Sequence, residues 1–389
     1  MTGIEDLPIL RTSERKAFKR CPQMWWWAWR DGLVPVKQKG GALWFGTGIH
    51  LALEHWYIPG KKRGIDPRET WEKFVKDQVE HVKVEMLSGD APDGSDVAWV
   101  EAGDLGKQIF DNYLKEYGQD ERWEVISPEQ SFQVLVPKPK TKIPIVNYAG
   151  TFDLVARDHQ DNGKLYLWDH KTAKSIQTGH LPLDDQAGSY WAVATHVLRK
   201  QGLIGAKESL KGITYNFIMK SPPDDRPENE FGLKCNKPVK SDYLEALAAF
   251  DKHLGHDEAL ISENFASNGK LTVTKLEEMA KSVGIRVLGK VSDKQPAKRF
   301  LRETVTRTSG ERRSQIERIG AEATVMDMFR YGDLPIIKNP TKDCQWECDF
   351  RTLCELDEQG GDTEEYISVV YKQEDPYAAH RLQNHEVEE

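Results

Sequence analysis

The clearest pattern of hydrophobic and polar positions lies between residues 123 and 220. Apolar side chains alternate with polar or outward-facing ones over 132–136, which is the spacing of a strand. Similar runs at 148–157 and 165–172 flank the sequence Asp-Asn-Gly at 161–163. Because Asn-Gly tolerates the positive φ of a tight turn, these two runs are predicted to pair as a hairpin.

A helix and a further strand follow the hairpin. Asp184 and Asp185 suit a helix N-terminus, where their carboxylates can accept hydrogen bonds from free amides. Alternation returns over 213–217, which completes a predicted β-β-β-α-β order. Both faces of the strand 165–172 are largely apolar, so we expect an α/β fold with a mixed central sheet covered by helices on both sides.

Helical spacing outside this region predicts the covering elements. Ser13 can cap a first helix that ends near Cys21, and Pro22 fits the first turn of a second helix. The glycine-containing run 46–50 opens another helix that continues to Trp56. The remaining predicted elements are helices over 71–86, 97–117, 243–262 and 275–283, loops over 89–95 and 222–240, a strand over 300–306, and a long helix from its cap Ser309 to Tyr331.

These elements divide the chain into successive segments. They are N-terminal helices (1–60), a helical insertion (61–122), the sheet core (123–220), a loop with a helical and basic region (221–330), a cysteine-containing segment (331–356) and a tail (357–389). The tail is acidic and contains glycine, and we expect it to be mobile.

The composition limits the class of protein. The chain has 389 residues, is 39% hydrophobic and carries a formal net charge of −8. It has no apolar run of about eighteen residues and no start that resembles a signal peptide, so we expect a soluble cytoplasmic protein without membrane contacts. A nucleic-acid enzyme with this charge must concentrate its basic residues locally.

A basic run within 290–313 offers such a concentration. A run of this kind is usually a solvated face, but in this acidic chain it is also the candidate track for a DNA backbone. Its members are Lys290, Lys294, Lys298, Arg299, Arg302, Arg307, Arg312 and Arg313.

The hairpin carries the candidate chemistry. Asp169 and Lys171 are two residues apart on one strand and therefore share a face, and the hairpin brings Asp153 to the neighbouring strand. Two carboxylates can hold Mg²⁺ or Mn²⁺, and a lysine beside a metal can orient or deprotonate a water molecule. The alternative is a surface hairpin with an ordinary Asp/Lys pair.

Two short motifs resemble a known family. Gly150-Thr-Phe-Asp153 and Asp169-His-Lys171-Thr172 resemble the core of the PD-(D/E)XK nuclease superfamily, in particular its RecB-like branch. Matching elements extend from about Cys21 to Cys354. The resemblance implies a restriction-endonuclease-like fold and a metal-dependent nuclease.

The resemblance also implies metal ligands beyond the two aspartates. Gly46-Thr-Gly-Ile-His50 is similar to the first motif of the family, whose histidine helps to bind the metal. Glu54 lies one helical turn from His50 and is a secondary candidate. His170 lies between the two catalytic candidates on its strand, so its side chain points away and its backbone carbonyl is the expected ligand.

Further candidates flank the predicted site. Gln186 and Tyr190 are similar to the Gln-x-x-x-Tyr motif of the family, which lies near the active site and contacts DNA. Glu129 precedes the strand 132–136 and either orients a metal-bound water or is simply exposed. The tryptophans of 25–29 either pack the core or stack on DNA bases, and we favour packing.

Five cysteines complete the set of reactive side chains, and their odd number makes a disulfide framework unexpected. Cys344, Cys348 and Cys354 form a compact motif that needs a fourth thiolate, and Cys21 is the candidate. Such sets hold iron–sulfur clusters or zinc. Resemblance to the iron–sulfur branch of the family implies a [4Fe–4S] cluster that clasps the two ends of the chain, with structural Zn²⁺ as the alternative. Cys235 is expected to be free.

The expected function is a Mg²⁺- or Mn²⁺-dependent DNA exonuclease. Its substrate would be single-stranded DNA or DNA ends in recombination, repair or phage DNA processing. Helicase motifs are missing from the sequence, so a helicase or recombinase partner would have to unwind duplexes. The alternatives are a non-catalytic DNA-end-binding accessory protein with a vestigial site, and a zinc-stapled interaction protein. The oligomeric state stays open.

Overall fold

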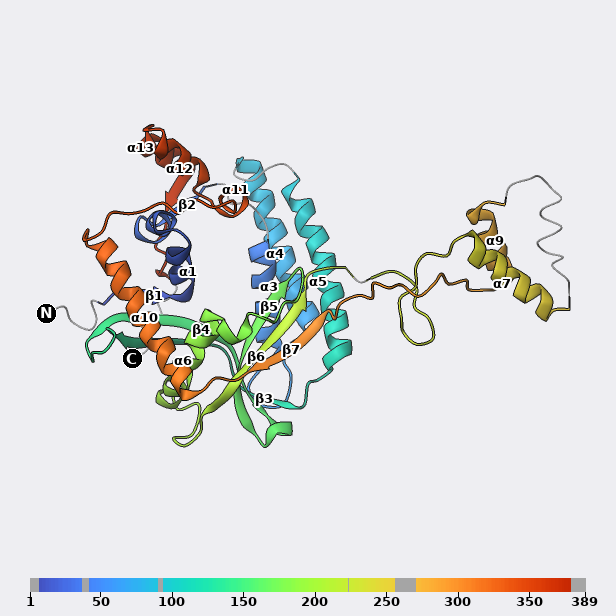
Figure 1. Cartoon of the computed structure of the whole chain (residues 1–389), viewed down its shortest axis with the longest axis horizontal. Coiled ribbons are helices and arrows are strands. Elements are labelled where there is room, and N and C mark those ends of the chain that lie inside the picture. The colour runs from blue at the N-terminus through green and yellow to red at the C-terminus, as the bar shows by residue number, and fades with distance from the viewer. Residues whose placement is uncertain (1–6, 37–41, 90–93, 223, 256–270, 379–389) are drawn as a thin grey trace. The chain divides into compact units, whose positions relative to one another are not determined.

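The computed structural model describes residues 7–36, 42–89, 94–222, 224–255 and 271–378. The chain forms two compact units (Figure 1). Unit 1 comprises Met1–Ser221 and Phe300–Glu389, and unit 2 comprises Pro222–Arg299. None of the helices in the described ranges has the length and apolar character that crossing a bilayer requires.

Unit 1 is built around a mixed sheet. Among the described residues, its six strands follow the order β1-β4-β5-β6-β7, with β3 paired to β4. Their bounds are β1 Ile9–Arg11, β3 Trp123–Pro137, β4 Pro144–Asp158, β5 Lys164–Ala173, β6 Leu210–Met219 and β7 Phe300–Val305. β3, β4 and β5 pair antiparallel, whereas β5 and β6 pair parallel through the crossover helix α6 (Asp185–Lys200). The predicted mixed sheet and β-β-β-α-β order are confirmed.

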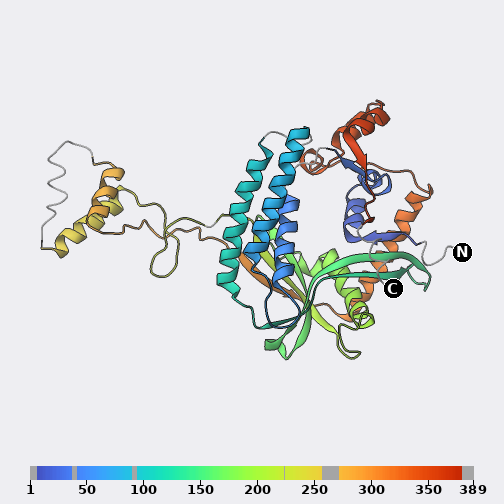
Figure 2. The same cartoon turned by 180° about the vertical axis from the view of Figure 1, so that it is seen from behind.

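Helices cover both faces of this sheet. The helices are α3 (Ala42–Trp56), α4 (Pro67–Ser88) and α5 (Ser95–Tyr117) on one face, and α1 (Thr12–Arg20), α6 and α10 (Ser309–Arg330) on the other. Figures 1 and 2 show each group side by side along its flank of the sheet. Leu165 and Leu167 of β5 belong to one hydrophobic core, and Tyr166 and Trp168 belong to the other. The prediction that both faces of this strand are buried is therefore confirmed.

Three predicted helix starts are wrong in detail. α1 begins at Thr12 directly after β1, with Arg11 rather than Ser13 at the N-cap. α10 is capped by Thr308, whose hydroxyl accepts the amide of Glu311. α3 begins at Ala42, so its glycines lie inside the helix. Gly48 is needed there because a Cβ atom would lie only 2.5 Å from the ring of Phe74 on α4.

The two ends of unit 1 pack against each other. The N-terminal elements are α2 (Pro22–Trp25), a π-helical turn (Trp26–Arg30) and β2 (Leu33–Pro35), and the C-terminal elements are α11 (Cys344–Glu347), α12 (Arg351–Glu358), α13 (Thr363–Val370) and β8 (Tyr371–Gln373). β2 pairs with β8, and Trp27 packs in a small core with Phe350 and Tyr371. Trp25 and Trp27 are buried, which favours the packing interpretation of the tryptophans.

The acidic tail has more structure than we expected. Its residues up to 378 form the end of α12, then α13 and β8, because Tyr371 is buried and stacks on Phe350. Residues 379–389 lie outside the described ranges.

Unit 2 is an insertion between β6 and β7. Its helices are α7 (Lys240–His253) and α9 (Val273–Ser282), and a core of its own includes Leu247 and Leu276. The predicted continuation of the first helix over 256–262 lies outside the described residues. Cys235 is buried and forms no disulfide, and it makes an isolated bridge to Val291 within the segment we expected to be a loop.

Candidate active site

The site lies where two strands of the sheet separate. The β4–β5 ladder runs from the hairpin to the pair Leu154 and Trp168, and one further step in register would place Asp153 opposite Asp169. Instead of continuing the ladder, the Asp153 carboxylate accepts the backbone amide of His170 at 2.7 Å. Upstream of this point, β4 pairs with β1 and β3. The fork frees backbone groups that an unbroken ladder would occupy, and the Asp153 carboxylate binds one of them.

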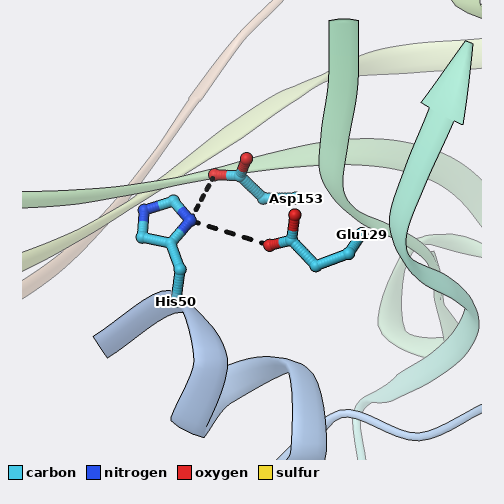
Figure 3. A group of neighbouring side chains, drawn as sticks. All are labelled: His50, Glu129 and Asp153. Atoms are coloured by element: carbon cyan, nitrogen blue, oxygen red, sulfur yellow. Dashed lines mark ion pairs between the residues drawn. The ribbon is translucent and has the colours of Figure 1, made fainter. Parts of the chain in front are cut away.

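His50 lies on α3 and reaches this fork from the face of the sheet that α3, α4 and α5 cover. Its Nδ1 atom lies 3.7 Å from Asp153 Oδ2 and 3.7 Å from Glu129 Oε1 (Figure 3). Its Nε2 atom lies 3.0 Å from the carbonyl oxygen of His170. The ligand atoms of His50, Glu129 and Asp153 all lie within 4.8 Å of one another, a grouping that could hold a metal ion. Glu54 is not part of this group in the described residues.

Glu129 occupies an unusual backbone position. It lies inside β3 rather than before a strand, and the pairs on either side of it place it opposite Asp153. Its φ of 40° is uncommon for a residue with a side chain and is typical of functional sites. Of the two interpretations left open by the sequence, the geometry favours a functional carboxylate, because this side chain faces His50.

Asp169 and Lys171 form a close pair on β5. The Lys171 ammonium lies 2.8 Å from Asp169 Oδ1 and 2.7 Å from Oδ2. Asp169 is 4% exposed, and its Oδ2 atom makes this charge contact without a well-oriented hydrogen bond. Carboxylate oxygens suit Mg²⁺ or Mn²⁺, but within the described residues Asp169, a predicted metal ligand, lies outside the group formed by His50, Glu129 and Asp153.

Burial and the closely spaced carboxylates of this site shift the pKa values of its titratable groups. Burial alone would lower the pKa of His50, but the carboxylates of Asp153 and Glu129 outweigh burial and raise it to about 9. Burial raises the pKa of Asp169 to about 6, against the opposing effect of Lys171. Burial likewise raises the pKa of Asp153. Several carboxylates are thus held in a poorly hydrated place, where a cation would be stabilising.

The family assignment agrees with this geometry. The sequence model of the PD-(D/E)XK nuclease superfamily matches residues 12–355, which contain every strand of the sheet except β1 and every residue named at the fork. The chain belongs to the PD-(D/E)XK nuclease superfamily. Comparison with curated protein sequences gives no significant match. Because nucleases of this superfamily use divalent metals, the donor set at the fork has the chemistry that the superfamily requires.

Gln186 and Tyr190 lie on α6 beside the candidate site. Tyr190 packs edge-on against Phe132 and Phe152, with ring centroids 5.4 and 5.7 Å apart. A Cβ atom at Gly150 would lie 2.9 Å from the Tyr190 ring, so the glycine of the Gly150-Thr-Phe-Asp153 motif makes room for this tyrosine. Gln186 lies nearer the surface and accepts a hydrogen bond from Lys16 at 3.2 Å.

The His170 ring points away from the fork into a buried polar network. Asn216 Nδ2 lies 3.0 Å from His170 Nδ1 and 3.0 Å from the hydroxyl of Tyr113. Burial lowers the pKa of His170 well below its usual value, so its ring is neutral. Arg302 joins the network through Asn216 and Tyr113 and pairs with Asp120 at 2.6 Å. The His170 ring is thus held in place by residues that are far from it in the sequence. By fixing the ring, they also fix where the His170 carbonyl lies.

Arg302 does not belong to a DNA track, and that expectation is wrong. Its side chain is 14% exposed, and its guanidinium lies over the rings of Tyr117 and Trp168. Alternation along β7 directs it inward, which a linear run of charges cannot show. The rest of the predicted run is divided between unit 2, up to Arg299, and unit 1. In unit 1, Arg307 donates to the carbonyl of Asp184 at the start of α6.

Four cysteines line one cavity at the junction of the two chain ends. The cavity has a volume of about 570 Å³ and is lined by Cys21, Cys344, Cys348 and Cys354. The four cysteines are free of disulfides. The backbone amides of Asn339 and Thr341 donate to the sulfurs of Cys21 and Cys344 at 3.4 Å each. Cys21 and the three cysteines of the C-terminal motif therefore line the same cavity.

Proposed function

We propose that this protein is a Mg²⁺- or Mn²⁺-dependent DNA exonuclease that acts on single strands or strand ends. The observation that carries the proposal is the meeting of His50, Glu129 and Asp153 at the fork beside the Asp169–Lys171 pair. Membership of the PD-(D/E)XK superfamily supports nuclease chemistry in general. Superfamily membership does not specify a DNA substrate or cleavage from a strand end, and both are part of our proposal.

The residues divide into ligands and reacting groups. His50, Asp153, Asp169 and the carbonyl of His170 would hold the ion, which supplies an activated water and neutralises charge on the phosphate. Lys171 would orient the attacking water and donate to a phosphate oxygen as negative charge develops there. Glu129 faces the same space and would accept a hydrogen bond from that water.

Gln186 and Tyr190 would hold the DNA strand beside the reacting groups. Gln186 lies near the surface next to Lys16, so both can face a backbone phosphate. The Tyr190 ring is fixed by Phe132 and Phe152, and Phe152 directly precedes Asp153. Unwinding of duplex DNA would fall to a helicase or recombinase partner.

The proposal includes a [4Fe–4S] cluster bound by Cys21, Cys344, Cys348 and Cys354. Around a zinc ion, sulfurs at about 2.3 Å from the metal would be about 3.8 Å apart. In the described residues no three of these sulfurs lie within 4.8 Å of one another, and the shared cavity is large. Within the described ranges this spacing does not match a single bound zinc ion. The bound cluster would tie the N-terminal helices to α11 and α12.

The cluster has a spectroscopic test that does not depend on nuclease activity. Anaerobically purified protein should be brown and contain about four irons per chain. Cys348→Ala should lose the colour, whereas Cys235→Ala should keep it because Cys235 lies buried in unit 2. Colourless wild-type protein that contains one zinc ion would contradict the cluster.

The exonuclease activity is tested with end-labelled single- and double-stranded DNA in Mg²⁺ and in Mn²⁺. We expect nucleotides to be released from substrates with free ends, and circular single-stranded DNA to stay intact. Cleavage of the circle would indicate an endonuclease. DNA binding without any release of nucleotides in either metal would favour the accessory-protein alternative.

A further inference from the structure

The guanidinium of Arg307 lies against the first turn of α6. Its Nη2 atom donates to the carbonyl of Asp184, the N-cap residue of that helix, at 2.6 Å. Gly188 leaves room for it, because the three atoms nearest to a Cβ atom on this glycine would all belong to the Arg307 guanidinium and would overlap with it. Arg307 itself lies on the connection between β7 and α10. The two contacts hold its charged group in one place beside the start of α6.

This end of α6 adjoins the Asp169–Lys171 pair. In the parallel ladder of β5 and β6, Asp169 is paired with Tyr215, which packs in the core on the α6 side of the sheet. Burial raises the pKa of Tyr215, and the charges of Asp184 and Asp169 raise it further, whereas the charge of Arg307 lowers it. Asp169, Asp184 and Arg307 therefore all lie near one tyrosine. Arg307 borders the candidate site on the side of β6.

The charge of Arg307 is not matched by a carboxylate. In the part of the chain that the structure describes, Arg307 forms no ion pair, and its Nε and Nη1 atoms have no hydrogen-bond partner. The Glu311 carboxylate accepts the amide and the hydroxyl of Thr308 instead. Asp185, an acid in the first turn of α6, is paired with Arg15. Arg307 is partly exposed, so its free N–H groups can reach a ligand.

A guanidinium with free N–H groups suits a phosphate. Its planar donors match the oxygens of a phosphate in pairs, and it keeps its charge throughout the physiological pH range. Gln186 and Lys16 contact each other on the α1 side of α6, whereas Arg307 lies on the β6 side. A strand whose scissile phosphate lies at Lys171 would therefore meet Arg307 where it continues past the start of α6 toward β6.

We propose that Arg307 binds a backbone phosphate of the DNA strand beside the bond that is cut. The inference rests on the proposed nuclease function and adds the side of the site along which the strand continues. The contact is to the phosphate, so it is independent of base sequence. The alternative is that Arg307 only fixes the start of α6, and the test separates the two roles.

The test compares three variants with the wild type. Arg307→Gln removes the guanidinium. Gly188→Ala keeps the guanidinium but displaces it, because the added methyl group would take its place. Arg199→Gln is the matched control, because Arg199 also donates to a backbone carbonyl, that of Glu208, but at the other end of α6. Binding of a fluorescent single-stranded oligonucleotide is measured in Ca²⁺ at several salt concentrations, cleavage is measured in Mn²⁺, and the melting temperature of each variant is recorded.

Arg307→Gln should bind the oligonucleotide about tenfold more weakly. The slope of log affinity against log salt concentration should fall by about 0.7, the value for one phosphate contact with a single strand. Gly188→Ala should change affinity and slope in the same direction. KM should rise by a larger factor than kcat falls, because the contact is already made in the bound substrate. Arg199→Gln should match the wild type in affinity and slope.

Unchanged affinity and salt slope in Arg307→Gln would overturn the phosphate contact, and so would a wild type that does not bind single strands. A lower melting temperature and a lower kcat at an unchanged salt slope would also overturn it, because a residue that only fixes α6 gives this result. If Arg307→Gln does not fold, the same comparison is made with Gly188→Ala. A wild type that binds the oligonucleotide but does not cut it would end the exonuclease proposal alone, and the binding comparison would still decide the role of Arg307.

Discussion

The two faces of β5 both carry polar groups at their ends, yet they are built differently. On the face toward α6, Leu165 and Leu167 lead to Asp169 and Lys171, and Asp169 Oδ2 is buried without a well-oriented hydrogen bond. On the face toward α3 to α5, His170 enters a network with Arg302, whose charge is matched by Asp120.

The first face carries the groups that we expect to react, and the second face carries groups that hold the fold together. A buried charge whose bonding capacity is not filled costs free energy, and such groups are kept where they bind or react. A charge that is paired and hydrogen-bonded on all sides holds neighbouring elements in place. We therefore expect substitutions on the first face to reduce activity and substitutions on the second face to reduce stability.

The largest expected effect is on activity at the first face. Asp169→Ala or Lys171→Ala should lower kcat by about 10³-fold, because each removes a ligand or a group that stabilises developing charge. Circular dichroism should show an intact fold. Lys164→Ala, on the same strand but at its far end, is the control and should keep its activity. Either site variant with wild-type cleavage of single-stranded DNA in Mn²⁺ would contradict the assignment.

The next effect is on stability at the second face. Arg302→Met should lower the free energy of unfolding by about 3–5 kcal/mol, because it leaves Asp120 buried without its partner. Denaturant titration measures this loss. Replacing both residues, as Arg302→Met with Asp120→Leu, should recover much of it. A single variant within about 1 kcal/mol of the wild type would show that the network is not the support we describe.

A smaller effect is expected where α3 packs on α4. Gly48→Ala should cost about 1–3 kcal/mol, because its Cβ atom would overlap Phe74 and displace the helix that carries His50. Gly310→Ala is the control, because the nearest atom to its added Cβ lies 3.8 Å away. Thermal unfolding of the two variants gives the comparison, and equal melting temperatures would argue against close α3–α4 packing.

The smallest effect is a pH dependence near α6. Burial would raise the pKa of Asp185, but Arg15 and Lys19 outweigh it and lower the pKa to about 2. A lowered carboxyl pKa adds stability above the unfolded-state value near 4, and that stability is lost as pH falls toward 2. Allowing for solvent screening, Asp185→Asn should cost about 1–2 kcal/mol at pH 7 and progressively less between pH 4 and pH 2. A cost that does not change with pH would point to packing instead.

The sequence predicts the sheet well because its signals are local. Alternation over 148–157 and 165–172 and the Asn162-Gly163 turn each act within a few residues, and they place Asp153, Asp169 and Lys171 at one edge. Cap positions are less certain, since Thr308 and Ser309 both have a hydroxyl that can accept an amide. The structure uses Thr308 because Glu311 completes a capping box with it.

The parts that sequence did not predict depend on long-range contacts. Arg302 pairs with Asp120, a residue 182 positions away, and a run of basic residues does not show which one turns inward. Glu129 has no clear signal because the Ser-Pro sequence before it interrupts the alternation, and its role emerges only beside Asp153.

Binding of Mn²⁺ to the metal-free protein tests the central claim most directly. Calorimetry or electron paramagnetic resonance would compare the wild type with Asp153→Ala and with Glu54→Ala, whose glutamate lies one turn from His50 but outside the group at the fork. We predict that the wild type and Glu54→Ala bind Mn²⁺ alike and that Asp153→Ala binds at least about tenfold more weakly. Equal Mn²⁺ affinity in Asp153→Ala and the wild type would contradict a metal site at the fork between β4 and β5.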